Sequence, residues 1–180
     1  MEPISRLDAA ARGPLVRFYL GEQPDSRGRF IREILSWTDA QLEDVHDYIQ
    51  WLFPTRSPSP VNPEAPVLDD DQIRDFLYDD RLQGQVVVAF KRMMAFYGFE
   101  VLDRDDVRIA RAPHWNVASR QWLTHGNHNF LRLTRILTCL RLVGLKTYSR
   151  ALLEALTSVY QQEGECIGRK TMEFWQSAAR

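Results

Sequence analysis

Apolar residues recur at intervals of three and four along much of the chain, which is the spacing of amphipathic helices. The best-defined of these segments begins at Thr38, which has the spacing of a capping box with Gln41 three residues later. Its apolar positions are Leu42, Val45, Ile49, Leu52 and Phe53. Pro54 ends the segment, because a proline ring clashes with the preceding turn and offers no N–H. We therefore expect one continuous helix over 39–53.

The same spacing predicts the remaining elements. The predicted helices cover 14–20, 29–37, 70–79, 81–97, 127–143, about 147–162 and 169–178. The segment 81–97 is apolar around most of its circumference, which is typical of a central, buried helix. Residues 107–111 alternate like a short strand, and the rest of 99–126 has the pattern of a loop. These elements predict an all-α fold, an irregular multi-helix single domain over 1–180, with one short β pair near 99–111.

The composition is that of an ordinary globular domain. Of 180 residues, 44% are hydrophobic and 26% are charged, and a chain of this length buries enough surface to fold without disulfides or metal. Two cysteines, Cys139 and Cys166, are too few for a disulfide framework and fit a reducing compartment. The N-terminus lacks the apolar segment of a secretory signal, and no apolar run approaches the roughly 20 residues of a membrane helix. We expect a soluble, intracellular protein in the cytoplasm.

The net charge of −1 conceals two segments of opposite charge. Residues 39–80 contain eleven acidic residues and two arginines, whereas residues 104–150 contain nine basic residues and two aspartates. Two interpretations are open. In the first, the segments neutralise each other inside the domain through ion pairs. In the second, they lie on separate surfaces and attract charged partners.

Two long stretches of the chain are distinctive in sequence. They read FYLGEQPDSRGRFIREILSWTDAQLEDVHDYIQWLFP (18–54) and NHNFLRLTRILTCLRLVGL (127–145). Both resemble the conserved domain of the opioid growth factor receptor family, and the similarity covers most of the chain. The resemblance implies kinship with largely nuclear vertebrate proteins that bind the pentapeptide methionine-enkephalin and restrain proliferation. The chain lacks their long polar C-terminal extension and basic nuclear-import segments, so we expect the bare domain, without their location or growth control.

The string HDYIQW supplies the first candidate ligand-binding site. On the predicted helix, His46 and Gln50 lie one turn apart, and Asp47 and Trp51 lie together on the charged face. A carboxylate beside an indole ring attracts an ammonium group through charge pairing and cation–π contact, as the N-terminus of a peptide requires. In the alternative, Trp51 is buried under the proline-rich loop 55–66, and Asp44 and Asp47 pair with arginines of the basic segment 104–150. His46 and Gln50 would then form a buried, hydrogen-bonded pair that ties a loop to the helix.

The string NHNFLRLTR supplies the second candidate site. His128, Arg132 and Arg135 have the i, i+4, i+7 spacing of one helix face, with Asn129 near the helix start. Guanidinium groups and the free N–H groups of a helix start bind carboxylates and phosphates. In the alternative, Arg132 and Arg135 form ion pairs with the acidic helices predicted over 39–52 and 70–79.

Patterns of catalysis and metal binding are weak. Three histidines and a cysteine are too scattered for a zinc site; they are His114, His125, His128 and Cys139. The sequence contains no glycine-rich phosphate loop and no nucleophile motif. We therefore expect no cofactor and no metal, and the sequence gives no support for an enzyme.

The leading functional hypothesis is a peptide- or protein-binding module. Its groove would lie between the helix that carries HDYIQW and the helix that carries NHNFLRLTR. Asp47 and Trp51 would hold a cation or an aromatic group, whereas Arg132 and Arg135 would hold a carboxylate.

Two alternatives belong to other functional classes. The basic segment 104–150 would bind nucleic acid, since it offers three aromatic side chains for base stacking; these are Trp115, Trp122 and Phe130. The other alternative is an enzyme built on His46 and His128. The two imidazoles would then line one deep pocket.

Overall fold

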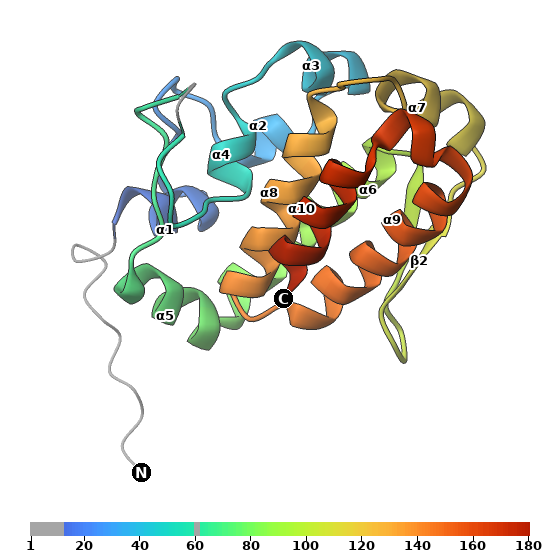
Figure 1. The fold of residues 1–180 in the computed structure, drawn as a ribbon. Coiled ribbons are helices and arrows are strands. Elements are labelled where there is room, and N and C mark those ends of the chain that lie inside the picture. Colours follow the sequence, from blue (N-terminus) through green and yellow to red (C-terminus); the bar gives the residue numbers. More distant parts are fainter. Residues whose placement is uncertain (1–12, 60–61) are drawn as a thin grey trace.

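The computed structural model describes residues 13–59 and 62–180. This part of the chain folds into ten helices and one antiparallel strand pair, which confirms the predicted all-α fold with its short β pair (Figure 1). The helices are α1 (Pro14–Tyr19), α2 (Ile31–Leu35), α3 (Asp39–Asp44), α4 (Ile49–Leu52), α5 (Asp70–Tyr78), α6 (Asp80–Phe96), α7 (Trp115–Trp122), α8 (Asn129–Leu142), α9 (Lys146–Ile167) and α10 (Arg169–Ala179). The strands are β1 (Phe99–Leu102) and β2 (Arg108–Arg111).

Helix α8 lies in the middle of the molecule, with α4 on one side and α10 on the other (Figure 1). It packs against both α9 and α10. The apolar face that the spacing predicted is fully buried; it consists of Leu133, Ile136, Leu137 and Leu140. Gly144 follows the helix with a φ of 86°, a backbone conformation that favours glycine.

A row of aromatic rings connects four of the helices. Tyr97, at the end of α6, meets Trp122 of α7 at a centroid distance of 5.6 Å, edge to face. Trp122 meets Phe130 of α8 at 6.4 Å, and Phe130 meets Trp175 of α10 at 5.8 Å. Such pairs add about 0.5–1.5 kcal/mol each beyond the area that they bury. The row therefore fixes α8 against its neighbours.

The single helix predicted over 39–53 is wrong. The chain leaves helical geometry at Val45, where φ is −89° and ψ is 130°, and α4 begins four residues later. In a continuous helix the carbonyls of Leu42 and Val45 would accept hydrogen bonds from amides four residues on. They accept them instead from the guanidinium of Arg132, at 2.9 and 3.0 Å. A side chain from α8 thus compensates for the break.

The loop predicted through the rest of 99–126 is also wrong in part, because α7 forms there. The buried residues of α7 are Trp115, Ala118, Ser119 and Trp122. Their i, i+3, i+4, i+7 spacing is that of one helix face. The signal for this helix was therefore present in the sequence.

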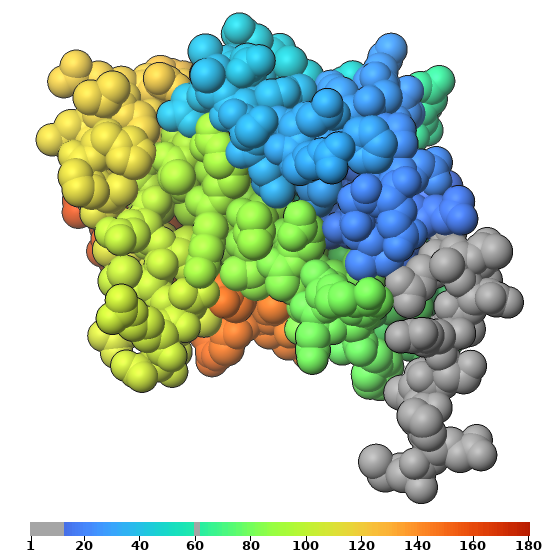
Figure 2. Space-filling model, turned by 180° about the vertical axis from the view of Figure 1, so that it is seen from behind, coloured from blue at the N-terminus to red at the C-terminus, as the bar shows by residue number. Residues whose placement is uncertain are grey.

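The back of the molecule exposes part of α6, in green, between the blue N-terminal segments and the yellow-green strand pair (Figure 2). Seven of the 17 residues of α6 are buried, on the face that packs into the core, and Val88 on its outer side is 50% exposed. The prediction that α6 is buried around most of its circumference is therefore correct for one face only. Within the described residues, no helix combines the length and the apolar character that crossing a membrane requires.

Candidate functional site

The first half of α8 lies against the end of α3, and Arg132 joins the two. This side chain is only 5% exposed. Its two terminal nitrogens donate to the carbonyls of Leu42, Glu43 and Val45 at distances of 2.9 to 3.3 Å. These are the carbonyls that α3 leaves without amide partners where it ends. Arg132 is therefore a structural cap, enclosed by the protein.

Glu43 is the acidic residue at the same contact. Its carboxylate accepts a hydrogen bond of 3.0 Å from Nδ2 of the fully buried Asn129 and lies 3.7 Å from Arg132. Nε2 of His128 lies 3.5 Å from the other carboxylate oxygen. Three of the four candidate residues on α8 and at its start thus surround one carboxylate of α3.

The two charged segments neutralise each other at Glu43 but not generally. Other carboxylates of the acidic segment pair with arginines outside 104–150. The pairs are Asp47 with Arg27 and Arg29, Asp39 with Arg92, and Asp70 with Arg56. The charge pattern of the sequence therefore predicts more ion pairs between the two segments than the structure contains among its described residues.

His46 and His128 stand side by side at the edge of this contact. Their ring centroids are 4.9 Å apart, and Nδ1 of His46 lies 2.8 Å from the carbonyl oxygen of Asp44. Burial lowers the pKa of His128 below its ordinary value, and the positive charge of Arg132 lowers it further, against the opposing effect of Glu43. Neither imidazole lines the groove described below.

The other residues of HDYIQW are engaged within the fold. Asp47 accepts from Arg29 Nη1 at 2.7 Å and from Arg27 Nε at 3.2 Å. Trp51 is 5% exposed, with its ring edge to face with Phe18 at 5.2 Å. Gln50 is 4% exposed and donates from Nε2 to Ser59 Oγ at 3.5 Å. With the helix broken, Trp51 leaves the charged face and enters the core.

The second half of α8 borders an open groove of about 450 Å³. One wall is the start of the loop after α4, and the other is the outward face of α8. The lining residues are Thr55, Arg56 and Ser57 from the loop, and Leu131, Thr134, Arg135, Thr138, Arg141 and Leu142 from α8. The α8 residues recur at intervals of three and four, so helical geometry alone places them on one face.

Arg135 is the candidate residue that faces this groove. Its Nη1 donates to the carbonyl of Phe53 at 3.3 Å and to the hydroxyl of Thr55 at 3.4 Å, both of which are long hydrogen bonds. Partial burial lowers the pKa of Arg135 below its ordinary value. Within 13–59 and 62–180 no carboxylate forms an ion pair with Arg135. The groove thus contains a half-buried cation whose counter-ion the described part of the chain does not supply.

The remaining groove residues complete a mixed surface. Leu131 is 70% exposed, which is unusual for a leucine. The hydroxyls of Thr134 and Thr138 donate to carbonyls one turn earlier, at 2.9 and 3.0 Å, so their free lone pairs are acceptors. The groove therefore offers an apolar contact and two acceptors beside Arg135, and Arg56 and Arg141 also line it. Of the residues that line the groove, the sequence predicted only Arg135 as part of a binding site, although the spacing of polar residues on α8 was visible in it.

The aromatic side chains that the nucleic-acid alternative requires are buried. Trp115, Trp122 and Phe130 are at most 8% exposed, so they present no face on which a base could stack. In the described ranges, no group of three or more metal-binding side chains is arranged to hold a metal ion.

The chain is similar in sequence to known proteins. The family model described as the opioid growth factor receptor (OGFr) conserved region matches residues 11–180. The chain is 34% identical to the opioid growth factor receptor of Homo sapiens over 158 residues, which are 85% of this chain and 23% of that protein. Against the receptor of Rattus norvegicus it is 37% identical over 142 residues, 76% of this chain and 24% of the relative.

A second type of relative gives a similar result. The chain is 34% identical to the opioid growth factor receptor-like protein 1 of Mus musculus over 143 residues, 77% of this chain and 30% of that protein. It therefore spans less than a third of the length of these relatives. No solved structure matches it. Because the family model covers nearly the whole chain, the chain belongs to the opioid growth factor receptor family and corresponds to its conserved region.

Proposed function

We propose that the groove between α8 and residues 55–57 binds a peptide or protein segment that carries a carboxylate. The observation that supports this most strongly is Arg135, a half-buried guanidinium without an ion-pair partner among the described residues. Desolvating a cation costs free energy unless an anion compensates for it. A ligand carboxylate placed on Arg135 would supply that anion through charge-assisted hydrogen bonds.

The rest of the groove favours a peptide over a small inorganic anion. Leu131 offers exposed apolar area to a side chain, and the threonine oxygens on α8 accept hydrogen bonds from peptide N–H groups. The names of the relatives describe receptors for a growth factor, which agrees with recognition of a peptide or protein. The cation site predicted at Asp47 and Trp51 is not part of this proposal, because both residues have partners within the fold.

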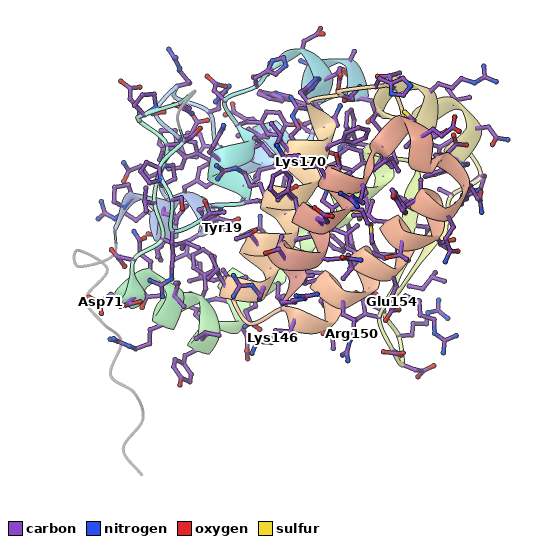
Figure 3. The ribbon with its side chains drawn as sticks, in the orientation of Figure 1. Tyr19, Asp71, Lys146, Arg150, Glu154 and Lys170 are labelled. Atoms are coloured by element: carbon purple, nitrogen blue, oxygen red, sulfur yellow. The ribbon has the colours of Figure 1, made fainter. Side chains whose placement is uncertain are left out.

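The proposal is tested by selection from a pool of short peptides with free C-terminal carboxylates, with methionine-enkephalin included. Immobilised wild type, Arg135→Gln and Arg150→Gln are compared. Arg150 is the matched control, because this exposed arginine of α9 lies by the strand pair, in a hollow lined also by Asp106 and Glu154 (Figure 3).

Wild type and Arg150→Gln should retain the same peptides. Arg135→Gln should bind them about 10- to 100-fold more weakly, since a hydrogen bond to a charged group contributes about 1.5–3 kcal/mol. Conversion of a retained peptide to its C-terminal amide should weaken binding to a similar extent. Equal retention by all three proteins, or retention of no peptide by wild type, would reject the proposal.

A further inference from the structure

The loop that forms one wall of the groove contains two serines that are each followed by proline in the sequence, Ser57 and Ser59. Their surroundings differ. Ser57 is exposed at the groove, whereas Ser59 is 6% exposed and its Oγ accepts a hydrogen bond from Gln50. A modifying enzyme therefore has access to Ser57 in the folded protein but not to Ser59.

Thr55 ties Ser57 to Arg135. The Thr55 hydroxyl donates to the backbone carbonyl of Ser57 at 3.3 Å and accepts from Nη1 of Arg135 at 3.4 Å. Ser57 and Arg135 both line the groove, as does Arg141. Arg56 lines the groove too, but it already has an ion-pair partner, since its Nη2 lies 2.5 Å from a carboxylate oxygen of Asp70. The exposed Ser57 thus lines the same groove as Arg135, whose half-buried guanidinium forms no ion pair with an acidic residue of the described chain.

We propose that Ser57 is a phosphorylation site and that its phosphate group occupies the groove on Arg135. The enzyme would be a kinase that selects serine before proline, with ATP as the phosphoryl donor. Oγ of Ser57 forms a bond to the γ-phosphorus as the bond from that phosphorus to the β–γ bridging oxygen breaks. ADP leaves, and the hydroxyl proton passes to the base of the kinase.

The negative charge of the phosphate determines its effect on the groove. Phosphoserine carries a charge of about −1.5 to −2 at neutral pH and three strong acceptor oxygens, and such a group orders a loop when arginines face it. It is therefore a suitable intramolecular counter-ion for Arg135. On the function proposed above, on which this step rests, the phosphate competes with the ligand carboxylate for the same guanidinium. Phosphorylation would close the groove to peptides.

The modification step is tested on the full chain with a purified proline-directed serine kinase, ATP and magnesium, followed by mass spectrometry. We expect phosphate on Ser57 of wild type, and no phosphate on Ser59, the one remaining serine of the pair, in Ser57→Ala. A synthetic peptide of residues 52–62 serves as the substrate control. The step is overturned if the kinase labels this peptide but leaves Ser57 of the folded chain unmodified, or labels Ser59 instead.

The contact with Arg135 is tested by placing phosphoserine at position 57 during synthesis and following its ³¹P resonance against pH. Ion pairing with Arg135 should lower the second pKa of the phosphate by about one unit relative to the same phosphopeptide, a shift that is equivalent to about 1.4 kcal/mol. Arg135→Gln should abolish the shift, and Arg150→Gln should leave it intact. A phosphate that titrates as in the free peptide overturns the inference.

The same phosphoprotein separates the two proposals. If wild type retains peptides, phosphoserine at position 57 should weaken their binding at least tenfold, and unchanged binding overturns the regulatory step. If wild type retains no peptide, the proposed function fails. The ³¹P titration then still decides whether the phosphate contacts Arg135.

Discussion

Arg132 of α8 donates a hydrogen bond of 2.9 Å to the carbonyl oxygen of Leu42, at the end of α3. One turn later on the same helix, Arg135 makes only long hydrogen bonds and faces an open groove. The two arginines are three residues apart and carry the same guanidinium group, but their surroundings differ. Arg132 stabilises the fold, whereas Arg135 is the arginine that we propose contacts a ligand.

The cap on α3 predicts a large effect of Arg132→Gln on stability. The substitution removes the donor to the carbonyls of Glu43 and Val45, and it leaves the carbonyl of Leu42 with only the hydroxyl of Tyr48. The free energy of unfolding should fall by about 2–4 kcal/mol, as measured by urea denaturation.

The control for this measurement is Arg150→Gln, which removes an exposed arginine and should change stability by less than about 0.5 kcal/mol. Arg135→Gln should lie closer to this control than to Arg132→Gln. A loss for Arg132→Gln no larger than that of Arg150→Gln would show that Arg132 does not hold α3.

The histidine beside Glu43 predicts a dependence of stability on pH. The pKa of His128 is lowered in the fold, mainly by burial, so the unfolded chain, with a histidine pKa of about 6.5, takes up the proton more readily. The free energy of unfolding should therefore be highest above pH of about 6.5 and should decrease as the pH falls through that value.

Denaturation series between pH of about 5 and 8 test this linkage. His128→Gln should flatten the profile, whereas His125→Gln, which removes an exposed histidine, should preserve it. Identical slopes in wild type and His128→Gln would exclude His128 as the source.

Two glycines predict opposite responses to alanine. Gly84 lies inside α6 with open space where a Cβ would be, so Gly84→Ala should stabilise the protein by about 0.5–1 kcal/mol. Gly98 has a φ of +84°, and an added Cβ would lie 2.9 Å from Cβ of Ala118. Gly98→Ala should therefore destabilise by about 1–3 kcal/mol. Thermal unfolding of both variants checks the pair, and a change of the same sign in both would contradict the backbone geometry.

The sequence predicted the elements that depend on local pattern. The buried face of α8 followed from apolar spacing, and the hydrogen bonds between Thr38 and Gln41 confirm the predicted capping box. The prediction of one helix over 39–53 was wrong because the break in it is stabilised by Arg132, about 90 residues later in the chain. A local sequence pattern contains no information on such a contact.

The candidate site was predicted only in part, because it too depends on contacts between residues far apart in the sequence. Spacing placed Arg132 and Arg135 on one face of α8, which is correct at the level of the helix. It contained no information on which of them would meet α3 and which would meet the loop after α4. The groove also depends on Thr55 and Ser57, whose positions follow from tertiary contacts.

The central claim is that ligand binding uses Arg135 and leaves Arg132 in place. It is tested most directly by recording the side-chain Nε–H resonances of arginine in ¹⁵N-labelled protein, while a peptide retained in the selection experiment is added. The account predicts that the Arg135 resonance shifts and saturates, whereas those of Arg132 and Arg150 do not move. Saturation of binding with the Arg135 resonance unchanged would contradict it.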